Sequence, residues 1–347
     1  MKVLITGCTG LVGTIAAKGL SDAGAEVIGF SRNAKDIEGV SKSIIGNVAN
    51  YDELKAAMTG CDAVLHLAAY HMPYDAPEQD VFHINAGGTF NVFKACAELG
   101  IKRLTVASSP NAIGYNFGIK LRDIAYLPLD GAHPLYTTDP YSFTKQMIEE
   151  IGRYYYRRYG ISSVFMRLGL AFTSTVEEWV VGKGGADLPG LRALVDQLLA
   201  LSPKEAAQEV RRIENEMDAR RSYAMNEAPP FENGTEYVYA AFSDEQRVWS
   251  YYVHNFLMFL DSRDLADAIV KSLNANFDGS HDLFIADDKN MLGVESAKLA
   301  ALLYPGARVH YDQLQGYDAL VDYRTAEKVI GFRAKHSVAD YYGELYK

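Results

Sequence analysis

The feature that most constrains this chain is its opening segment KVLITGCTGLVG, where a short apolar run leads into glycines at positions 7, 10 and 13. The run Val3-Leu4-Ile5 has the length and composition of a strand buried in a parallel sheet. From residue 11 to residue 23 the pattern is that of an amphipathic helix, and a second apolar run, AEVIGF, follows it. Strand, glycine turn, helix and strand in about thirty residues predict the first βαβ unit of a dinucleotide-binding sheet.

Each glycine has a separate expected role in such a unit. Gly7 permits the tight turn, Gly10 lets the backbone approach a pyrophosphate, and Gly13 lets the helix pack on the strand. The spacing alone is a weak signal in a chain with 29 glycines, because a plain turn between strand and helix can show it by chance. The rest of the chain favours cofactor binding over the plain turn.

The alternation of apolar strands and helices continues along the chain. We expect further strands at 43–48, 62–69, 102–109, 162–170 and 281–286, and helices at 51–58, 78–99, 139–159, 263–273 and 294–303. Helices between nearly continuous apolar strands predict an α/β fold with a doubly wound, parallel Rossmann sheet.

Between residues 173 and 253 this rhythm breaks. The stretches LPGLRALVDQLLAL and SPKEAAQEVRRIENEMDARRS predict two helices, the second opened by a capping box of Ser202 and Glu205. Five acidic and five basic residues lie between Lys204 and Arg221. They are typical of a solvated face with intrahelical ion pairs, or alternatively of a partner contact. Neither helix precedes a strand-like run, so we expect a lid or substrate wall, with an assembly element as the alternative.

Composition narrows the class of protein. A net charge of −10 disfavours a general nucleic-acid-binding surface. The first strand starts at Lys2, and no apolar run reaches the roughly eighteen residues that span a bilayer, so we expect a cytoplasmic location and no membrane partner. Cys8, Cys61 and Cys96 are dispersed, which predicts small buried hydrophobes rather than disulfides or a metal site.

Two segments place reactive side chains at the expected carboxyl edge of the sheet. SSPNAIGY follows the strand at 102–109, and YSFTK opens the next helix, where Tyr141 and Lys145 share one face because they are four residues apart. The chain holds a second such pair, Tyr51 and Lys55, without a hydroxyl cluster upstream, which we interpret as a solvated helix face.

This combination suits hydride-transfer chemistry. A free phenol is a poor base at neutral pH, and we expect the Lys145 ammonium to lower the pKa of Tyr141. Tyr141 then takes a proton from a substrate hydroxyl while Ser109 hydrogen-bonds the same oxygen, and Lys145 binds the nicotinamide ribose.

At this point the sequence resembles the extended short-chain dehydrogenases/reductases, also called NAD-dependent epimerase/dehydratases. The motifs that carry the resemblance are TGCTGLVG, HLAA, NAGGTFNVFKAC, ASSPNAIG, DPYSFTK, SRDLADAI and GF, in family order. The resemblance implies a Rossmann domain at 1–172, a mainly helical insertion at 173–253, and further Rossmann elements with a smaller C-terminal substrate lobe at 254–347. It also implies a homodimer made by the helix that carries Tyr141 and the helix before it.

The motifs also assign site residues. The expected cofactor-binding residues are Gly7, Thr9, Gly10, Leu11, Val12, Ser31, Arg32, Asn47, Val48, Leu67, Ala68, Ala69, Tyr141 and Lys145. The expected substrate-binding residues are His71, Ser109, Asn111 and Tyr141. A plain loop histidine is the alternative for His71.

Departures from the family pattern narrow the activity. Ser109 is followed by Pro110-Asn111 where family dehydratases carry an acidic pair, so no acid is placed for water elimination. Gly169 stands where many nucleotide-sugar enzymes have asparagine. SSPNAIGY and MRLGLAF are similar to the uronate dehydrogenase branch, yet the arginine expected to hold a substrate carboxylate is absent from TSTVEEWVVG.

The second strand ends in GFSRN, without the acidic residue that NAD-selective enzymes usually place there. Ser31 and Arg32 are suited to a 2′-phosphate, so NADP(H) is favoured and NAD(H) is possible. A surface loop arginine is the alternative.

We expect an NAD(P)-dependent oxidoreductase that interconverts a secondary alcohol and a ketone, or a lactol and a lactone, on a small polar, carbohydrate-like substrate. A nucleotide-sugar 4-epimerase with retained NAD uses the same three residues and is one alternative. An NADP-sensing interaction protein is another, disfavoured because a sensor needs no proton-transfer group.

Overall fold

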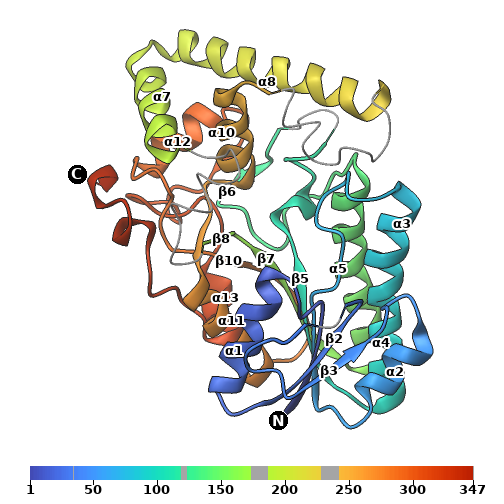
Figure 1. Ribbon diagram of the computed structural model, residues 1–347. Coiled ribbons are helices and arrows are strands. Elements are labelled where there is room, and N and C mark those ends of the chain that lie inside the picture. The colour runs from blue at the N-terminus through green and yellow to red at the C-terminus, as the bar shows by residue number, and fades with distance from the viewer. Residues whose placement is uncertain (34, 119–122, 173–186, 228–241, 347) are drawn as a thin grey trace.

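A computed structural model describes residues 1–33, 35–118, 123–172, 187–227 and 242–346 of the chain (Figure 1). Its larger part is a parallel seven-stranded sheet in the order β10-β7-β5-β4-β1-β2-β3. These strands are β1 (Lys2–Thr6), β2 (Glu26–Ser31), β3 (Lys42–Ile45), β4 (Ala63–His66), β5 (Arg103–Ser108), β7 (Ser162–Leu168) and β10 (Ser280–Ile285). The chain order reverses between β1 and β4, and open α/β sheets bind their ligands outside the carboxyl ends of the strands at such a point.

Helices cover both faces of the sheet (Figure 1). One face packs on α1 (Leu11–Asp22), α11 (Ser262–Asn274) and α13 (Arg324–Ile330), and the other on α2 (Tyr51–Met58), α4 (Gly88–Leu99) and α5 (Pro140–Tyr159). Alternate residues of β1 serve the two layers, because Val3 and Ile5 lie in one core and Leu4 lies in the other. The doubly wound α/β fold predicted from the sequence is confirmed.

Some predicted boundaries were wrong in detail. The helix expected at 78–99 consists of α3 (Glu78–Phe82), a π-helical turn (His83–Gly87) and α4. The strand expected at 43–48 ends at Ile45. The strand expected at 162–170 is interrupted at Gly169, after which β8 (Leu170–Phe172) leaves the main sheet and pairs with β9 (Phe259–Asp261). Apolar runs mark a strand but do not show where it changes partner.

A smaller lobe lies beyond the carboxyl ends of the strands. It contains α7 (Leu188–Ala200), α8 (Pro203–Glu227), α10 (Asp244–Tyr252), α12 (Ser296–Leu303), a pair of short strands, β6 (Tyr126–Leu127) and β11 (Arg308–Val309), and the final turns Val338–Asp340 and Gly343–Tyr346. One hydrophobic core joins these elements, with contributions from Leu191, Val195, Ile213, Met217, Leu292 and Leu299. The described part of the 173–253 segment therefore packs with the C-terminal lobe.

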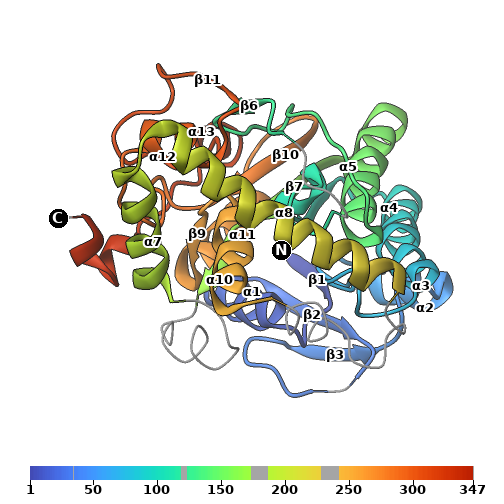
Figure 2. The same ribbon diagram turned by 90° about the horizontal axis from the view of Figure 1, so that it is seen from above.

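Helix α8 runs across the top of the molecule, from the small lobe toward the side occupied by α3 and α5 (Figure 1). Seen from above, it crosses over the central sheet (Figure 2). The predicted capping box is present, since Ser202 N donates to Glu205 Oε2 at 3.0 Å and Glu205 N donates to Ser202 Oγ at 3.4 Å. The described residues 187–227 add no strand to the central sheet, as the sequence predicted.

The charges of α8 do not all face solvent. Arg212 pairs within the helix with Glu209 and Glu216, as expected for a solvated face. Arg221, in contrast, is only 2% exposed, and Glu214 also turns inward. The interpretation of the whole charge run as a solvated face was therefore wrong for these two residues.

The three cysteines are buried free thiols, as expected for small core residues. Among the described residues, none of the helices combines the length and the apolar character that a membrane crossing requires.

Candidate active site

The glycine turn has the geometry that a dinucleotide needs. Gly7 adopts a φ of +72°, and a Cβ atom there would lie 2.8 Å from the backbone nitrogen of Ala68. A Cβ on Gly13 would lie 2.5 Å from the Gly7 carbonyl oxygen, so α1 can approach β1 only with glycine at this position. Gly10 caps α1 without any side-chain hydrogen bond, and the first helical turn holds no acidic residue. The positive end of the helix dipole is thus open to a phosphate, and the turn fits a dinucleotide.

The backbone after β4 is held beside this turn by buried polar side chains. The Thr6 hydroxyl accepts from the backbone N–H groups of Leu67 and Ala68, each at 3.2 Å, and lies 2.7 Å from His66 Nδ1. The other ring nitrogen, Nε2, lies 3.0 Å from Thr89 Oγ1. Burial, helped by the charge of Lys145, lowers the pKa of His66 to about 3, so the ring is neutral.

Asn85, in the π-helical turn, extends this support. Its Oδ1 accepts from Tyr70 N at 2.8 Å, while its Nδ2 donates to Tyr70 O and to Thr144 Oγ1 on the catalytic helix. His66 and Asn85 lie in the motifs HLAA and NAGGTFN, but the sequence alone assigned neither residue a role. The available signal was a histidine ending an otherwise apolar strand.

The residues expected near the adenosine lie at the ends of β2 and β3. Ser31 Oγ donates to Asn33 O at 2.7 Å. Arg32 is exposed, and its guanidinium carbon lies 5.8 Å from the ring centroid of Tyr70. Within the described ranges Arg32 forms no ion pair, so its charge is available to an anion. Val48 is buried against Gly88, and the Asn47 side chain accepts from Ala49 N at 3.0 Å.

The three expected catalytic residues come together at the end of β5. Ser109 lies close enough to Tyr141 to oppose the rise of the phenol pKa, and it caps the 3-10 turn Pro110–Ile113 by accepting from Asn111 N at 3.1 Å. Lys145, one turn after Tyr141 on α5, donates from Nζ to Ala107 O at 2.7 Å. All three side chains are buried. Asp139 starts α5 by accepting from Ser142 N at 2.8 Å, and this cap fixes where the helix presents Tyr141.

The expected lowering of the Tyr141 pKa was wrong for this arrangement. Burial raises the pKa of Tyr141 to about 12, against the opposing effect of the Ser109 hydrogen bond. The Lys145 ammonium lies 5.5 Å from the phenol ring centroid and is engaged by a carbonyl of β5. The desolvation of the Tyr141 phenolate has a larger effect on its pKa than the attraction of nearby groups. The spacing of Tyr141 and Lys145 in the sequence therefore could not show the direction of the pKa shift.

The expected substrate residues differ in setting. Asn111 is buried, and among the described residues its Oδ1 has no hydrogen-bond partner, as is also true of Asp139 Oδ2 and Ser142 Oγ. Such unsatisfied polar atoms are uncommon and suit a group that receives a ligand. The His71 side chain is 80% exposed, with Nδ1 3.1 Å from Asp75 Oδ2.

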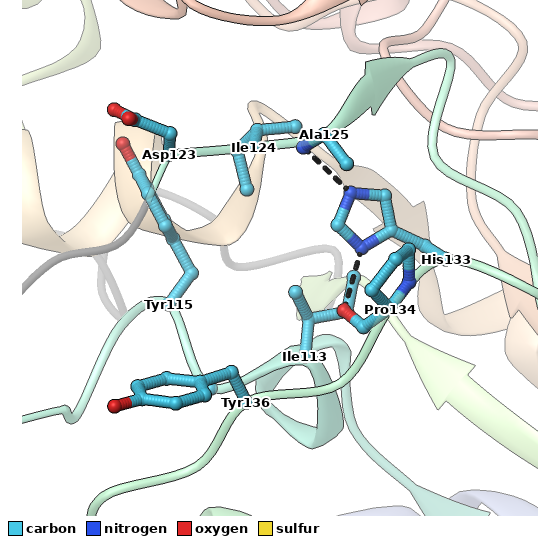
Figure 3. A pocket seen from close by; sticks show the side chains of 9 residues that line it. Ile113, Tyr115, Asp123, Ile124, Ala125, His133, Pro134 and Tyr136 are labelled. Atoms are coloured by element: carbon cyan, nitrogen blue, oxygen red, sulfur yellow. Dashed lines mark hydrogen bonds between the residues drawn. The ribbon is translucent and has the colours of Figure 1, made fainter.

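A cavity of about 320 Å³ opens beyond the turn that Ser109 caps (Figure 3). Ile113, Tyr115, Asp123, His133 and Tyr136 line it. His133 Nε2 accepts from Ala125 N at 3.1 Å, so Nδ1 carries the proton and donates to Pro134 O. Neither Ser109 nor Tyr141 lines this cavity, so it is not the reaction centre.

The family model described as NAD dependent epimerase/dehydratase family matches residues 3–177, half of the chain. The chain belongs to this family. L-arabinose 1-dehydrogenase (NAD(P)(+)) of Haloferax volcanii is 31% identical over 180 residues, which cover 50% of this chain and 68% of that protein. Uronate dehydrogenase of Pseudomonas syringae pv. tomato is 25% identical over 176 residues, covering 49% of this chain and 60% of that protein.

A solved structure shares the whole fold. A short-chain dehydrogenase/reductase superfamily protein from Agrobacterium tumefaciens with bound NAD has a TM-score of 0.64 at 21% identity, covering 100% of this chain and 96% of that one. At this identity the likeness concerns the fold alone. Family and relatives together identify an enzyme of the extended short-chain dehydrogenase/reductase class.

In this epimerase/dehydratase-family chain the catalytic helix rests on a buried ion pair. Arg167 of β7 donates to Glu149 through Nε at 3.0 Å and through Nη2 at 2.8 Å, and both side chains are fully buried. Ser108 Oγ also donates to Glu149 at 2.7 Å. Glu149 lies one turn after Lys145, where its charge favours the ammonium and partly offsets the desolvation.

Burial lowers the pKa of Lys145 to about 8, whereas an unfolded lysine titrates near about 10.4. Between these pH values the unfolded chain binds more protons, so the free energy of unfolding should rise with pH. Relative to Lys145→Met, the wild-type protein should gain about 2–3 kcal/mol between about pH 7.5 and 10.5. Denaturant unfolding at a series of pH values measures this difference.

The matched control is Lys42→Met, at an exposed position on β3, whose difference from wild type should not change with pH. Parallel pH curves for wild type and Lys145→Met would show that Lys145 does not titrate in this window.

Proposed function

We propose that the protein is an NAD(P)-dependent oxidoreductase that interconverts a secondary alcohol and a ketone, or a lactol and a lactone, on a carbohydrate-like substrate. The observation that carries the proposal is the grouping of three buried side chains at the end of β5, where Ser109 opposes the rise of the Tyr141 pKa and Lys145 lies one turn after Tyr141 on α5. The sugar and uronate dehydrogenases among the relatives support a polar substrate. Pro110-Asn111 after Ser109 leaves no acid placed for water elimination.

The chain's own groups divide the work of oxidation. The bound nicotinamide supplies the acceptor for the hydride that leaves the substrate carbon. Because burial raises the pKa of Tyr141 to about 12, the site holds a neutral phenol that can donate its proton in reduction. In oxidation Tyr141 must act as the phenolate, which accepts the proton of the substrate hydroxyl while Ser109 Oγ holds that oxygen in place. In reduction the same phenol returns the proton. Lys145 lies between Ala107 and Tyr141, where its ammonium can bind the nicotinamide ribose and stabilise the phenolate.

We expect Tyr141→Phe to lower turnover by at least about a hundredfold, because the ring stays and the proton-transfer group is lost. Cofactor affinity should stay within about twofold of wild type, since the glycine turn is untouched. A screen of sugars, sugar acids and nucleotide sugars with both cofactors, followed by absorbance of the reduced nicotinamide, finds the substrate and measures the effect.

Tyr51→Phe is the control, because Tyr51 and Lys55 have the same spacing on α2 but lie away from Ser109. Near-normal turnover of Tyr141→Phe would remove Tyr141 from the mechanism. Sugar isomerisation without release of reduced cofactor would instead identify the 4-epimerase.

The cofactor preference follows from the end of β2. Arg32 is exposed beside Tyr70 and free of ion pairs with described carboxylates, and no acidic residue follows β2 directly to bind a ribose 2′-hydroxyl. This setting supports a contact with a 2′-phosphate, so NADP(H) is the proposed cofactor.

Arg32→Ala should weaken NADPH binding by about 1.5–3 kcal/mol, or roughly 10- to 150-fold, and change NADH binding little, because only NADPH carries the 2′-phosphate. Titration calorimetry with both cofactors measures the two affinities. Lys42→Ala, which removes a cation from the neighbouring strand β3, is the control. Equal losses for NADH and NADPH in Arg32→Ala would contradict the preference.

We also propose a homodimer through α4 and α5. Large aromatic side chains are exposed on α3, α4 and α5, and two of them, Phe82 and Phe143, stack with ring centroids 5.9 Å apart. The exposed members are Phe82, Phe90, Phe143, Tyr154 and Tyr159. A monomer rarely exposes such a group, so a second copy is expected to cover it.

Light scattering should give twice the chain mass for the wild-type protein and the single chain mass for Phe90→Glu, because the charge would be buried in the interface. Tyr311→Glu, at an exposed aromatic residue outside these helices, should leave the mass unchanged. A wild-type mass of one chain would rule out the dimer.

A further inference from the structure

The inward-facing charges of α8 lead to the catalytic tyrosine. Glu214 and Arg221 are seven residues apart, two helical turns, and therefore share one face of α8. That face also carries Ile213 and Met217, which belong to the core of the small lobe. Two ionisable groups placed among apolar side chains require partners, because an unpaired buried charge is strongly destabilising.

The partner of both residues is His254, in the turn Val253–Asn255 that follows α10. His254 is fully buried, with Nε2 3.0 Å from Glu214 Oε2 and Nδ1 2.6 Å from Arg221 Nη2. A guanidinium can only donate, so Nδ1 accepts and Nε2 carries the proton that it donates to Glu214. Trp249 of α10 adds a second donor to Glu214 at 2.7 Å. We call Glu214, His254 and Arg221 the α8 relay.

The relay needs a neutral imidazole. A proton on Nδ1 would face the N–H groups of Arg221 and break one of the two bonds. Burial lowers the pKa of His254 below its usual range. The negative charges of Glu214 and Asp218 oppose this lowering. The charge of Arg221 adds to the lowering.

The far side of His254 contacts the segment that follows the catalytic serine. The His254 ring packs edge-on against Tyr115 with ring centroids 5.3 Å apart. Ser250 Oγ of α10 donates to Asn116 Oδ1 at 3.2 Å. Phe117 then packs edge-on against the Tyr141 ring at 5.7 Å. Residues 115–117 therefore form a wall with α10 and the relay on one side and the catalytic phenol on the other.

The charge of Arg221 also reaches the start of α5. Burial raises the pKa of Asp139 to about 6, and Arg221 is among the groups that oppose this rise. Asp139 caps the helix that presents Tyr141. The relay thus reaches Tyr141 by contact through the wall, and the charge of Arg221 acts in addition on the cap of α5.

We propose that Glu214, His254 and Arg221 are positioning residues that hold the 115–117 wall against Tyr141, so that the α8 insertion takes part in building the active site. The proposal rests on the proposed function of Tyr141 as the proton-transfer group. It assigns α8 a role in turnover rather than in cofactor binding, which depends on the distant glycine turn.

The test compares two substitutions of one residue. His254→Gln offers one acceptor and two donors and cannot titrate, so it can keep both bonds of the relay. His254→Leu keeps bulk but removes both bonds, so that among the described residues Glu214 retains only its Trp249 donor and Arg221 only its contact with Asp218. The control is Leu299→Ala, which removes a side chain from the same lobe core without touching the relay and should lower the melting temperature similarly.

With the substrate found by the screen, His254→Leu should lower kcat by about tenfold or more, while His254→Gln and Leu299→Ala stay within about threefold of wild type. The Kd of NADP(H) should be unchanged in all three variants. If His254→Leu loses no more turnover than Leu299→Ala, or if His254→Gln is as impaired as His254→Leu, the relay does not position Tyr141 and the proposal fails.

A second measurement does not depend on catalysis. Hydrogen exchange of the backbone amides of Asn116 and Phe117 should become about tenfold faster in His254→Leu and stay as in wild type in the other two variants. Unchanged exchange in His254→Leu overturns the proposal even if no substrate is found. Faster exchange with an inactive wild-type enzyme supports the relay and counts against the proposed reaction alone.

Discussion

The contact on which the reaction end of the molecule depends is the bidentate pair of Arg167 and Glu149. It joins α5 to β7 at full burial, and Glu149 also accepts a hydrogen bond from the hydroxyl of Ser108, the residue before the proposed catalytic serine. Taking both charges out of water costs several kcal/mol per ion, and this is offset only while both partners and their hydrogen bonds are present. The pair therefore allows few other positions of α5 on the sheet. On the same face of that helix, Tyr141 lies two turns and Lys145 one turn before Glu149.

The cofactor end of the proposed site, at the glycine turn, and its substrate end, at Ser109 and Tyr141, depend on different kinds of contact. At the cofactor end, the chain conformation from β1 to α1 follows from the steric limits of Gly7 and Gly13, and Gly7 also packs closely on the backbone of Ala68 after β4. At the substrate end, the positions of Ser109 and Tyr141 depend on groups far along the chain, such as Arg167, Asn85 and the α8 relay. The cofactor end therefore depends mainly on one local turn and the neighbouring strand end, whereas the substrate end depends on several distant segments.

This difference explains how much the sequence could predict. The βαβ unit, the doubly wound sheet and the helix carrying Tyr141 have local signatures, namely apolar periodicity, glycine spacing and caps, and the structure confirms these elements. The raised pKa of Tyr141 and the neutral state of His66 could not be predicted, because both depend on burial by segments distant in the chain. The inward turn of Glu214 and Arg221 was missed for a related reason. A helix with many charged residues is expected to turn them toward solvent. Only the position of His254 in the folded chain shows that Glu214 and Arg221 face the protein interior.

The core shared by α7, α8 and the C-terminal elements has a consequence for recombining family members. The small lobe is discontinuous in the chain, because Leu191 and Met217 pack in the same core as Leu292 and Leu299, with Rossmann strand β10 and helix α11 between the two groups in sequence. A chimera that exchanged only the C-terminal third with a relative would combine residues from two proteins in the single hydrophobic core of the small lobe. Crossover points that respect this interior must carry the helical segment and the chain end together.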